Sequence, residues 1–255
     1  MISKPFLFCS LVMVLFSEAL AAPPASKYWD DPKVQLLAEA GKAGDAKKIA
    51  TLIAEGVSVN AVGREGFTPL AYTMLSVSKK GFVALLKNGA DPNMQITGLP
   101  GGDGSIAGLA AQAEKDLFWL EQLDAAGADL NIAALRSGKS PIYFAISYHR
   151  IENLKWLIEK KVNLEVSDVQ KYSPLQYATS SGRWEAVYLL LEAGADWTKT
   201  LPKGQTIVDL IQTYSKNRNV LKTGPIWEWR NKVILLLKSK GCDVPPDLLT
   251  SATGP

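Results

Sequence analysis

The chain is poor in the residues that most often carry chemistry. It has one histidine and two cysteines among 255 residues. A zinc site built from Cys and His needs three or four such ligands. His149 has no nucleophile motif to serve, and no G-x-S-x-G segment of a hydrolase is present. We therefore expect no catalytic residue, no metal and no cofactor, and we predict that the protein is not an enzyme.

The chain also lacks an excess of charge of either sign. The formal net charge is +3, with 21% charged and 47% hydrophobic residues. Nucleic-acid-binding proteins normally carry a dense basic surface, so no nucleic-acid partner is expected. The hydrophobic content predicts a chain that folds around a core.

Long apolar runs are missing except near the start, at Pro5 to Phe16. That run is shorter than the roughly 20 residues that cross a bilayer. Lys4 precedes it, and Ala19 and Ala21 supply small residues before a cleavage point. We predict a signal peptide at 1–21, export across the inner membrane, and no membrane insertion after cleavage. An uncleaved anchor is the alternative.

Cleavage after Ala21 removes Cys9 and leaves Cys242 as the last cysteine. No intramolecular disulfide is then available, so an ordinary hydrophobic core must hold the fold. With the short leader, this favours a bacterial periplasm.

What the chain does have is a repeat. The segments FTPLAYT, KSPIYFA and YSPLQYA share a Thr/Ser-Pro-Leu/Ile core, and GSIAGLA and QTIVDLI are weaker copies. Their Thr or Ser residues are spaced 37, 35, 33 and 33 positions apart. A second signature, such as LLKNGADPN or LLEAGADWT, follows each copy, and LIAEGVSVN precedes the first. A stacked array of similar units is therefore predicted.

Each signature has a local physical role. The Thr or Ser hydroxyl caps a helix, and the following Pro already has a helical φ. A second helix, with Leu, Ile or Val at helical spacing, ends at the Gly of GAD in the left-handed conformation. One such unit cannot bury its apolar face alone, but stacked units can.

The period and both signatures resemble the ankyrin repeat, over roughly Val34 to Val244. This resemblance implies an all-α solenoid of about six helix-turn-helix units with β-hairpin finger loops. We predict an N-terminal extension at 22–33, the repeat domain at 34–244 and a C-terminal tail at 245–255.

The sequence departs from the family pattern in three places. The family's His after Thr-Pro-Leu is replaced in all five copies, among them by Tyr143 and Gln176, which predicts weaker hydrogen bonding between repeats. The spacing of 37 adds about four residues within Met94 to Gly104. GLPGGDGS, Gly98 to Ser105, looks faintly like a phosphate cradle but lacks the lysine, so a finger loop with turn glycines is favoured. The last repeat has about 14 extra residues, near 215–229.

The extra segment carries Trp227 and Trp229, two positions apart after Gly224-Pro225. Residues two apart on a helix do not share a face. We predict that one indole covers the end of the solenoid and the other faces a partner. The sequence leaves open which is which.

The resemblance also implies a binding surface on the concave side. Tyr, Phe and Arg are common in interfaces, and we expect this set to bind a partner: Arg64, Glu65, Phe67, Arg136, Lys139, Tyr148, Val169, Gln170, Tyr172, Lys203, Gln205, Tyr214, Trp227 and Trp229. Ordinary surface variability is the alternative.

The favoured function is a non-enzymatic periplasmic protein that binds another protein. Exported ankyrin proteins of this kind resemble type VI secretion immunity proteins, which occlude an antibacterial effector such as a phospholipase. The second hypothesis is a periplasmic scaffold or accessory protein that supports another envelope enzyme in stress defence, without inhibiting it.

Overall fold

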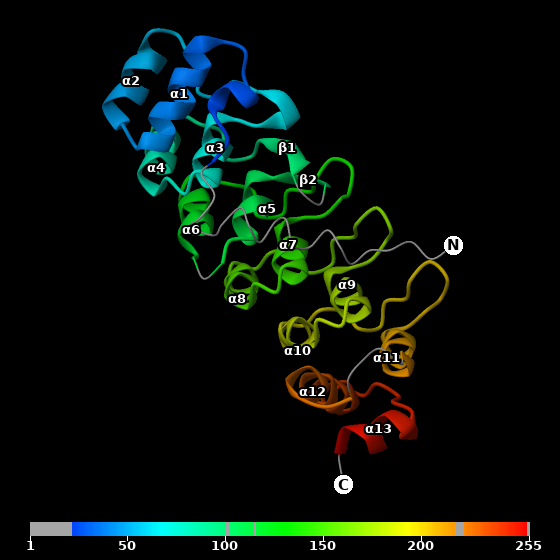
Figure 1. Ribbon diagram of the computed structural model, residues 1–255. Helices are drawn as coiled ribbons and strands as arrows, with labels where there is room; N and C mark the ends of the chain where they lie inside the picture. Colours follow the sequence, from blue (N-terminus) through cyan, green and yellow to red (C-terminus); the bar gives the residue numbers. More distant parts are fainter. Residues whose placement is uncertain (1–21, 100–101, 115, 218–221, 254–255) are drawn as a thin grey trace. The chain divides into compact units, whose positions relative to one another are not determined.

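The computed structural model describes residues 22–99, 102–114, 116–217 and 222–253 (Figure 1). The predicted signal peptide at 1–21 lies outside these residues. The chain forms two compact units, which divide between Ser137 and Gly138. None of the described helices combines the length and the hydropathy that crossing a membrane requires.

The described part of the N-terminal unit is built from pairs of short helices. The repeat signatures predict this order, because each Thr/Ser-Pro start is followed by a second helix and a glycine stop. The pairs are α1 (Pro32–Ala43) with α2 (Ala46–Ala54), α3 (Pro69–Leu75) with α4 (Lys79–Lys87), and α5 (Ile106–Ala111) with α6 (Phe118–Ala125).

The predicted capping residues cap their helices at four of the five repeat starts. The hydroxyls of Thr68, Ser105, Ser173 and Thr206 each accept a hydrogen bond from the backbone N–H three residues on. Such a bond satisfies a donor that the first turn of a helix leaves unpaired. Ser140 is the exception, since its buried hydroxyl makes no hydrogen bond in the described structure.

The glycine-rich stretch that looked faintly like a phosphate cradle is a finger. Strands β1 (Gln95–Leu99) and β2 (Gly102–Ser105) pair antiparallel, with Gln95 opposite Ser105 and Ile96 opposite Gly104. Within the described residues this is the one pair of strands. The fold is therefore mostly helical with a small hairpin.

Asp103 of β2 ties this hairpin to the loop that follows α6. The carboxylate is 5% exposed and accepts hydrogen bonds from the backbone N–H groups of Arg136 and Ser137. Burial alone would raise the pKa of Asp103, but these hydrogen bonds outweigh it and hold the pKa below its usual value.

Asp103→Asn is expected to lower the free energy of unfolding near neutral pH by about 1–3 kcal/mol, because a backbone donor loses its acceptor. A depressed folded-state pKa stabilises the protein above the unfolded value of about 4, and this contribution is lost as pH falls through the folded pKa. Urea unfolding at neutral and acidic pH should show the gap from wild type closing in acid. The exposed Glu55→Gln is the matched control, and a gap independent of pH would contradict the account.

The N-terminal extension folds against the first two helix pairs of its unit. It contains a short 3-10 helix, η1 (Ala25–Lys27), followed by buried Tyr28 and Trp29. The hydroxyl of Tyr72 on α3 donates to the carbonyl of Pro23 at 2.7 Å. The extension is thus part of the packed unit.

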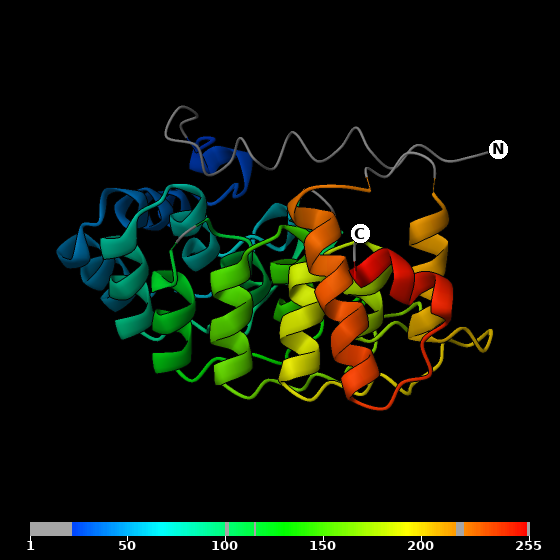
Figure 2. The same ribbon diagram turned by 90° about the horizontal axis from the view of Figure 1, so that it is seen from below.

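The C-terminal unit continues the helix pairs and adds a last helix. Its helices are α7 (Pro141–Ser147), α8 (Ile151–Glu159), α9 (Pro174–Ser180), α10 (Trp184–Glu192), α11 (Ile207–Lys216), α12 (Pro225–Ser239) and α13 (Pro246–Thr253). Both views show α12 between α10 and α13 (Figures 1 and 2).

The extra residues of the last repeat lengthen its helices. The segment predicted at 215–229 includes the end of α11 and the first turn of α12, and residues 218–221 lie outside the described part. The segment predicted as a tail at 245–255 carries α13, which packs on α12. Leu248 of α13 is 3% exposed, so this helix extends the core of the unit.

Candidate functional site

Two loops of the C-terminal unit project from its helix pairs. We call them finger A, residues 163–173 between α8 and α9, and finger B, residues 196–206 between α10 and α11. In finger A the buried carboxylate of Asp168 accepts from the backbone N–H groups of Gln170 and Tyr172, at 2.9 and 3.0 Å. The N–H of Asp168 donates to the carbonyl of Tyr172 at 3.1 Å. The tip is closed on itself and has little freedom to change shape.

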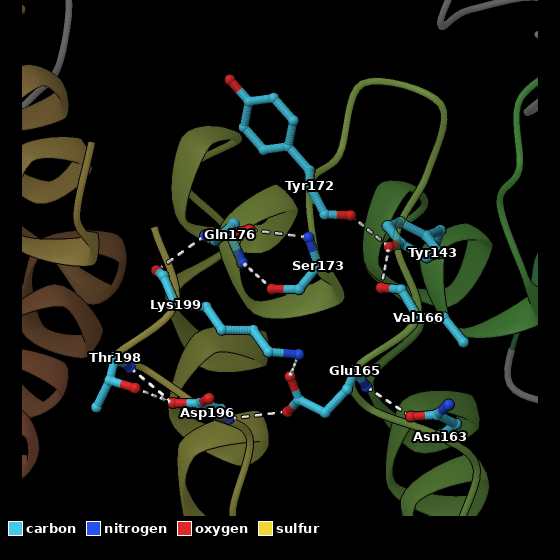
Figure 3. Close-up of polar contacts among 10 residues, drawn as sticks. All are labelled: Tyr143, Asn163, Glu165, Val166, Tyr172, Ser173, Gln176, Asp196, Thr198 and Lys199. Carbon is cyan, nitrogen blue, oxygen red and sulfur yellow. Dashed lines mark hydrogen bonds and ion pairs between the residues drawn. The ribbon is translucent and has the colours of Figure 1, made fainter. Parts of the chain in front are cut away.

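Tyr143 of α7 anchors the two sides of finger A where the loop meets the helices (Figure 3). Its hydroxyl lies 2.6 Å from the carbonyl oxygen of Tyr172 and 2.9 Å from that of Val166. Burial, helped by the charge of Asp168, raises the pKa of Tyr143 well above its usual value, so the hydroxyl stays a donor. The anchor therefore holds through the physiological pH range.

Gln176 plays the corresponding role for finger B. Its side chain accepts from the N–H of Ser173 at 3.0 Å and donates to the carbonyl of Lys199 at 3.0 Å. Tyr143 and Gln176 occupy the position of the missing family histidine. Both side chains still join neighbouring repeats by hydrogen bonds to backbone carbonyls, Tyr143 to Val166 and Gln176 to Lys199. The prediction of weaker hydrogen bonding between repeats stays a prediction.

The first residues of finger A and finger B contact each other. Glu165 accepts from the backbone N–H of Asp196 at 2.9 Å and pairs with the ammonium group of Lys199 at 2.7 Å (Figure 3). Asp196 in turn accepts from the N–H of Thr198. Fingers A and B thus form one hydrogen-bonded frame.

The residues at the tips point away from this frame. Figure 3 shows the ring of Tyr172 projecting away from the helices that hold its backbone. Val169 is 61% exposed, and Gln170, Lys203 and Gln205 are exposed as well. We call these five residues the finger surface. It combines an aromatic ring, an aliphatic side chain, two amides and a cation.

A polar hollow lies beside finger B. It has a volume of about 380 Å³ and is lined by Lys203, Gln205, Asp209, Gln212 and Lys216, among others. The backbone N–H and hydroxyl of Thr206 hold the pKa of Asp209 below its usual value. The carboxylate of Asp209 therefore serves the helix cap, and the two lysines give the hollow a positive balance.

Lys139 lies over the ring of Tyr177, which is not among the predicted binding residues. Its ammonium group is 4.5 Å from the ring centroid of Tyr177 on α9. The hydroxyl of Tyr177 lies 2.6 Å from that of Ser147. The repeat pattern marks this position as aromatic, because Tyr177 aligns with Tyr72 and Phe144 of the other copies.

Two other predicted tyrosines are less accessible. Tyr148 is the half-buried C-cap of α7. Tyr214 packs edge-on to Trp184, with ring centroids 4.9 Å apart, and covers Gly182 so closely that a Cβ there would lie 2.3 Å from the Tyr214 ring. Tyr214 thus packs α11 on the turn before α10 and is half-buried there.

The two tryptophans of the extra segment lie on different faces of α12. Trp227 is 9% exposed, and the guanidinium carbon of Arg230 lies 4.1 Å from its ring centroid. Trp229 is half-buried, with its ring 5.5 Å from that of Tyr188. Trp229 also lines a hollow of about 240 Å³ with His149, Arg183 and Ile226. Trp229 is thus the indole that remains accessible.

In the N-terminal unit, two of the predicted binding residues contact the unit's own extension. Arg64 pairs with Asp30 at 2.5 Å, and its guanidinium donates to the carbonyl of Lys27 at 3.0 Å. Phe67 is 3% exposed, with its ring 4.5 Å from that of Tyr28. The prediction for Phe67 was wrong, because the segment before α1 covers it.

The remaining two, Glu65 and Arg136, are exposed. Glu65 has a φ of 61° and lies against Gly98 of the hairpin. Arg136 is held through its backbone N–H by Asp103. Both side chains are accessible but belong to the N-terminal unit, apart from the finger surface.

Arg230 is a residue that sequence reasoning missed. It is 1% exposed, and its side chain donates to Ser215 of α11 and to Asn231, at 2.8 and 2.9 Å. Burial lowers the pKa of Arg230 to about 10. A single arginine in a polar stretch gives no hint of such burial before α11, α12 and α13 are brought together.

Among the residues with described positions, no group of three or more His, Cys, Asp or Glu side chains is arranged to hold a metal ion. The absence of a cofactor and of catalysis stays a prediction. What the fingers offer chemically is a fixed set of hydrogen-bonding groups, one cation and apolar surface.

Part of this chain is similar to a known repeat family, and its fold is similar to that of a solved structure. Residues 108–200 match a family model described as ankyrin repeats in three copies. The crystal structure of an ankyrin repeat domain from Acinetobacter baumannii AYE is similar, with a TM-score of 0.65 and 21% sequence identity. The match covers 81% of this chain and 98% of that one.

Two longer curated proteins are similar over part of their length. "Mitochondrial disaggregase" of Bos taurus is 27% identical over 146 residues, which is 56% of this chain and 20% of that protein. "Putative palmitoyltransferase ZDHHC13" of Danio rerio is 27% identical over 188 residues, 72% of this chain and 28% of that protein. The chain therefore spans less than a third of either relative.

Proposed function

Because this chain has the ankyrin-repeat fold, a protein–protein interaction module, we propose that it binds another protein through the finger surface of its C-terminal unit. The observation that carries the proposal is the hydrogen-bonded frame under the fingers. Asp168, Tyr143, Gln176 and Glu165 fix the backbone while Val169 and Tyr172 stay accessible. A surface ordered before binding loses less conformational entropy when the partner arrives.

The chemistry of the finger surface suits a partner with an acidic patch. Lys203 and Lys216 line the hollow beside finger B, and the carboxylate of Asp209 is engaged by Thr206. Opposite charge on the partner would steer association and fix its orientation. Tyr172 and Val169 would supply the desolvated contact at the centre.

The proposal for the partner is an antibacterial effector, and for the site of action the periplasm. It rests on the predicted signal peptide at 1–21 and on the resemblance to exported immunity proteins. A rigid finger surface would cover the effector's active site and occlude it. The protein would then inhibit without any chemistry of its own.

The first experiment identifies the partner and asks what binding does. A pull-down from the native envelope with mass spectrometry supplies candidates, and purified candidates are titrated with the mature protein. Immunity predicts stoichiometric inhibition of a toxic activity, and it predicts that cells lacking the protein become sensitive to the effector. A partner that binds without loss of activity would instead support the accessory role and would contradict immunity.

Tyr172→Ala is expected to weaken binding of the identified partner by about 2 kcal/mol, or roughly 30-fold, as removal of a central interface aromatic does. Thermal stability should change little, because the frame bonds Tyr172 through its backbone. Isothermal titration calorimetry gives the affinity. Glu192→Ala, exposed on α10, is the matched control. Equal affinities for wild type and Tyr172→Ala would place the interface elsewhere.

A further inference from the structure

A second accessible hollow lies on the outer helices of the N-terminal unit. It has a volume of about 440 Å³ and falls where α4 lies between α2 and α6 (Figures 1 and 2). Its wall is mainly apolar, and lysines stand at its edge. We call it the lysine-rimmed groove, formed chiefly by Ala46, Lys80, Val83, Ala84, Lys87 and Phe118.

The apolar wall is an open surface. Val83 and Phe118 are half-buried side chains that line the hollow. Ala84 behind them is 7% exposed and belongs to the core of α4. A concave apolar surface of this size accepts one large side chain from a partner.

The rim carries uncompensated positive charge. The charge of Lys79 is already paired, because its ammonium group lies 2.9 Å from the carboxylate of Asp116 and 4.8 Å from the ring centroid of Phe118. Within the described residues, no ion pair joins Lys80 or Lys87 to an acidic group. Two exposed cations therefore face solvent beside an apolar wall.

Two of the helix starts at the groove are already capped by carboxylates. The groove includes the first residues of α2 and α6, and it runs along α4 from Lys79 to Lys87. The carboxylates of Asp45 and Asp116 already accept from the backbone N–H groups of Lys48 and Phe118 at the starts of α2 and α6. The N-terminus of a helix carries partial positive charge, and negative groups are stabilised there. The partial charge at the starts of α2 and α6 is thus already used by these aspartates, and the preference for a negative ligand rests on the exposed Lys80 and Lys87.

We infer that the lysine-rimmed groove docks an acidic segment of a partner protein, with one aromatic or branched aliphatic side chain seated in the hollow. The hollow is concave and so complements a projecting side chain. A bilayer surface is engaged by apolar groups that protrude from the protein. This docking surface lies on the outer helices, on different elements from the finger surface, and the proposal does not depend on that function.

A defined probe tests the proposal. It is a fluorescein-labelled peptide in which one tryptophan is flanked on both sides by alternating aspartate and glutamate, and its binding to the whole mature protein is followed by fluorescence anisotropy. A second peptide has glycine in place of the tryptophan. We expect saturable binding of the first peptide and at least about tenfold weaker binding of the second, because only the first fills the hollow.

Charge reversal at the rim supplies the protein variants. The double substitution Lys80→Glu with Lys87→Glu is expected to weaken binding of the tryptophan peptide at least about tenfold, because the new carboxylates repel the acidic peptide. Lys238→Glu with Lys240→Glu changes two exposed lysines, one in the last turn of α12 and one at its C-cap, and alters net charge equally. This pair should leave binding within about twofold, since only long-range screened charge is lost. Thermal unfolding checks folding, and Lys80→Gln with Lys87→Gln replaces the first pair if it unfolds.

Three results would overturn the inference. They are absence of saturable binding, equal affinity for the two peptides, and equal weakening by the two pairs of charge reversals. Vesicles of phosphatidylcholine with phosphatidylserine form a further arm. The wild-type protein could float with these vesicles and fail to bind the peptide, while the Lys80→Glu, Lys87→Glu variant no longer floats. That result would assign the groove to lipid and refute a protein ligand.

Discussion

Replacing Trp227 with alanine is expected to lower the free energy of unfolding by about 3–5 kcal/mol, the usual cost of removing a large aromatic side chain from a core. Trp227 is 9% exposed on α12 and lies beneath the guanidinium group of Arg230. Its loss would also admit water to Arg230, whose hydrogen bond to Ser215 joins α12 to α11. The variant should therefore weaken the last three helices together.

Trp229→Ala is the matched control, two residues further along the same helix. Trp229 is half-buried against Tyr188, so its removal should cost about 1 kcal/mol, mostly as lost ring contact. Urea unfolding followed by circular dichroism measures both variants without relying on tryptophan emission. Equal losses would contradict the assignment of Trp227 to the core. A silent Trp227→Ala would mean that α12 does not close the unit.

Gly81→Ala is expected to destabilise the N-terminal unit by about 1–3 kcal/mol, the cost of forcing extra atoms into a packed contact. Gly81 of α4 lies so close to α1 that a Cβ would fall 1.8 Å from the carbonyl oxygen of Gly41. The hydroxyl of Ser78 donates to the same oxygen at 2.8 Å. The added methyl must therefore separate two backbones and break this bond.

The sign of this effect is informative, because alanine is favoured over glycine inside a helix by roughly 1 kcal/mol. A helix that merely needed better propensity would gain stability from the change. Lys80→Ala, at the exposed neighbouring position, is the control and should be nearly neutral. Denaturant unfolding of both variants decides the question, and a stabilised Gly81→Ala would show that α1 and α4 do not approach closely in solution.

The sequence alone was enough to predict the repeat architecture. Thr68-Pro69 and Ser173-Pro174 mark helix starts through a hydroxyl acceptor and a preset φ, both local properties. Glycines such as Gly194, with a φ of 88°, mark the stops in the same local way. Repetition multiplies these weak signals, which is why the helix pairs and the hairpin finger were predictable.

The accessible surface was harder to predict, because it depends on what covers each residue. Phe67 aligns with groove positions, yet the segment before α1 packs Tyr28 against it. Tyr214 likewise aligns with a surface position but is used to cover Gly182. Alignment places a residue on an element, and burial depends on neighbours that the repeat pattern does not encode.

For this protein, the sequence by itself determined the helix starts and stops, the period and the finger positions, since each rests on contacts within a few residues. Only the tertiary structure decided which of Trp227 and Trp229 is buried, that Tyr143 and Gln176 replace the missing histidine as anchors, and that Lys80 and Lys87 border an apolar hollow. These features join elements distant in sequence, and packing fixes them through distances and exclusion of water that no local pattern carries.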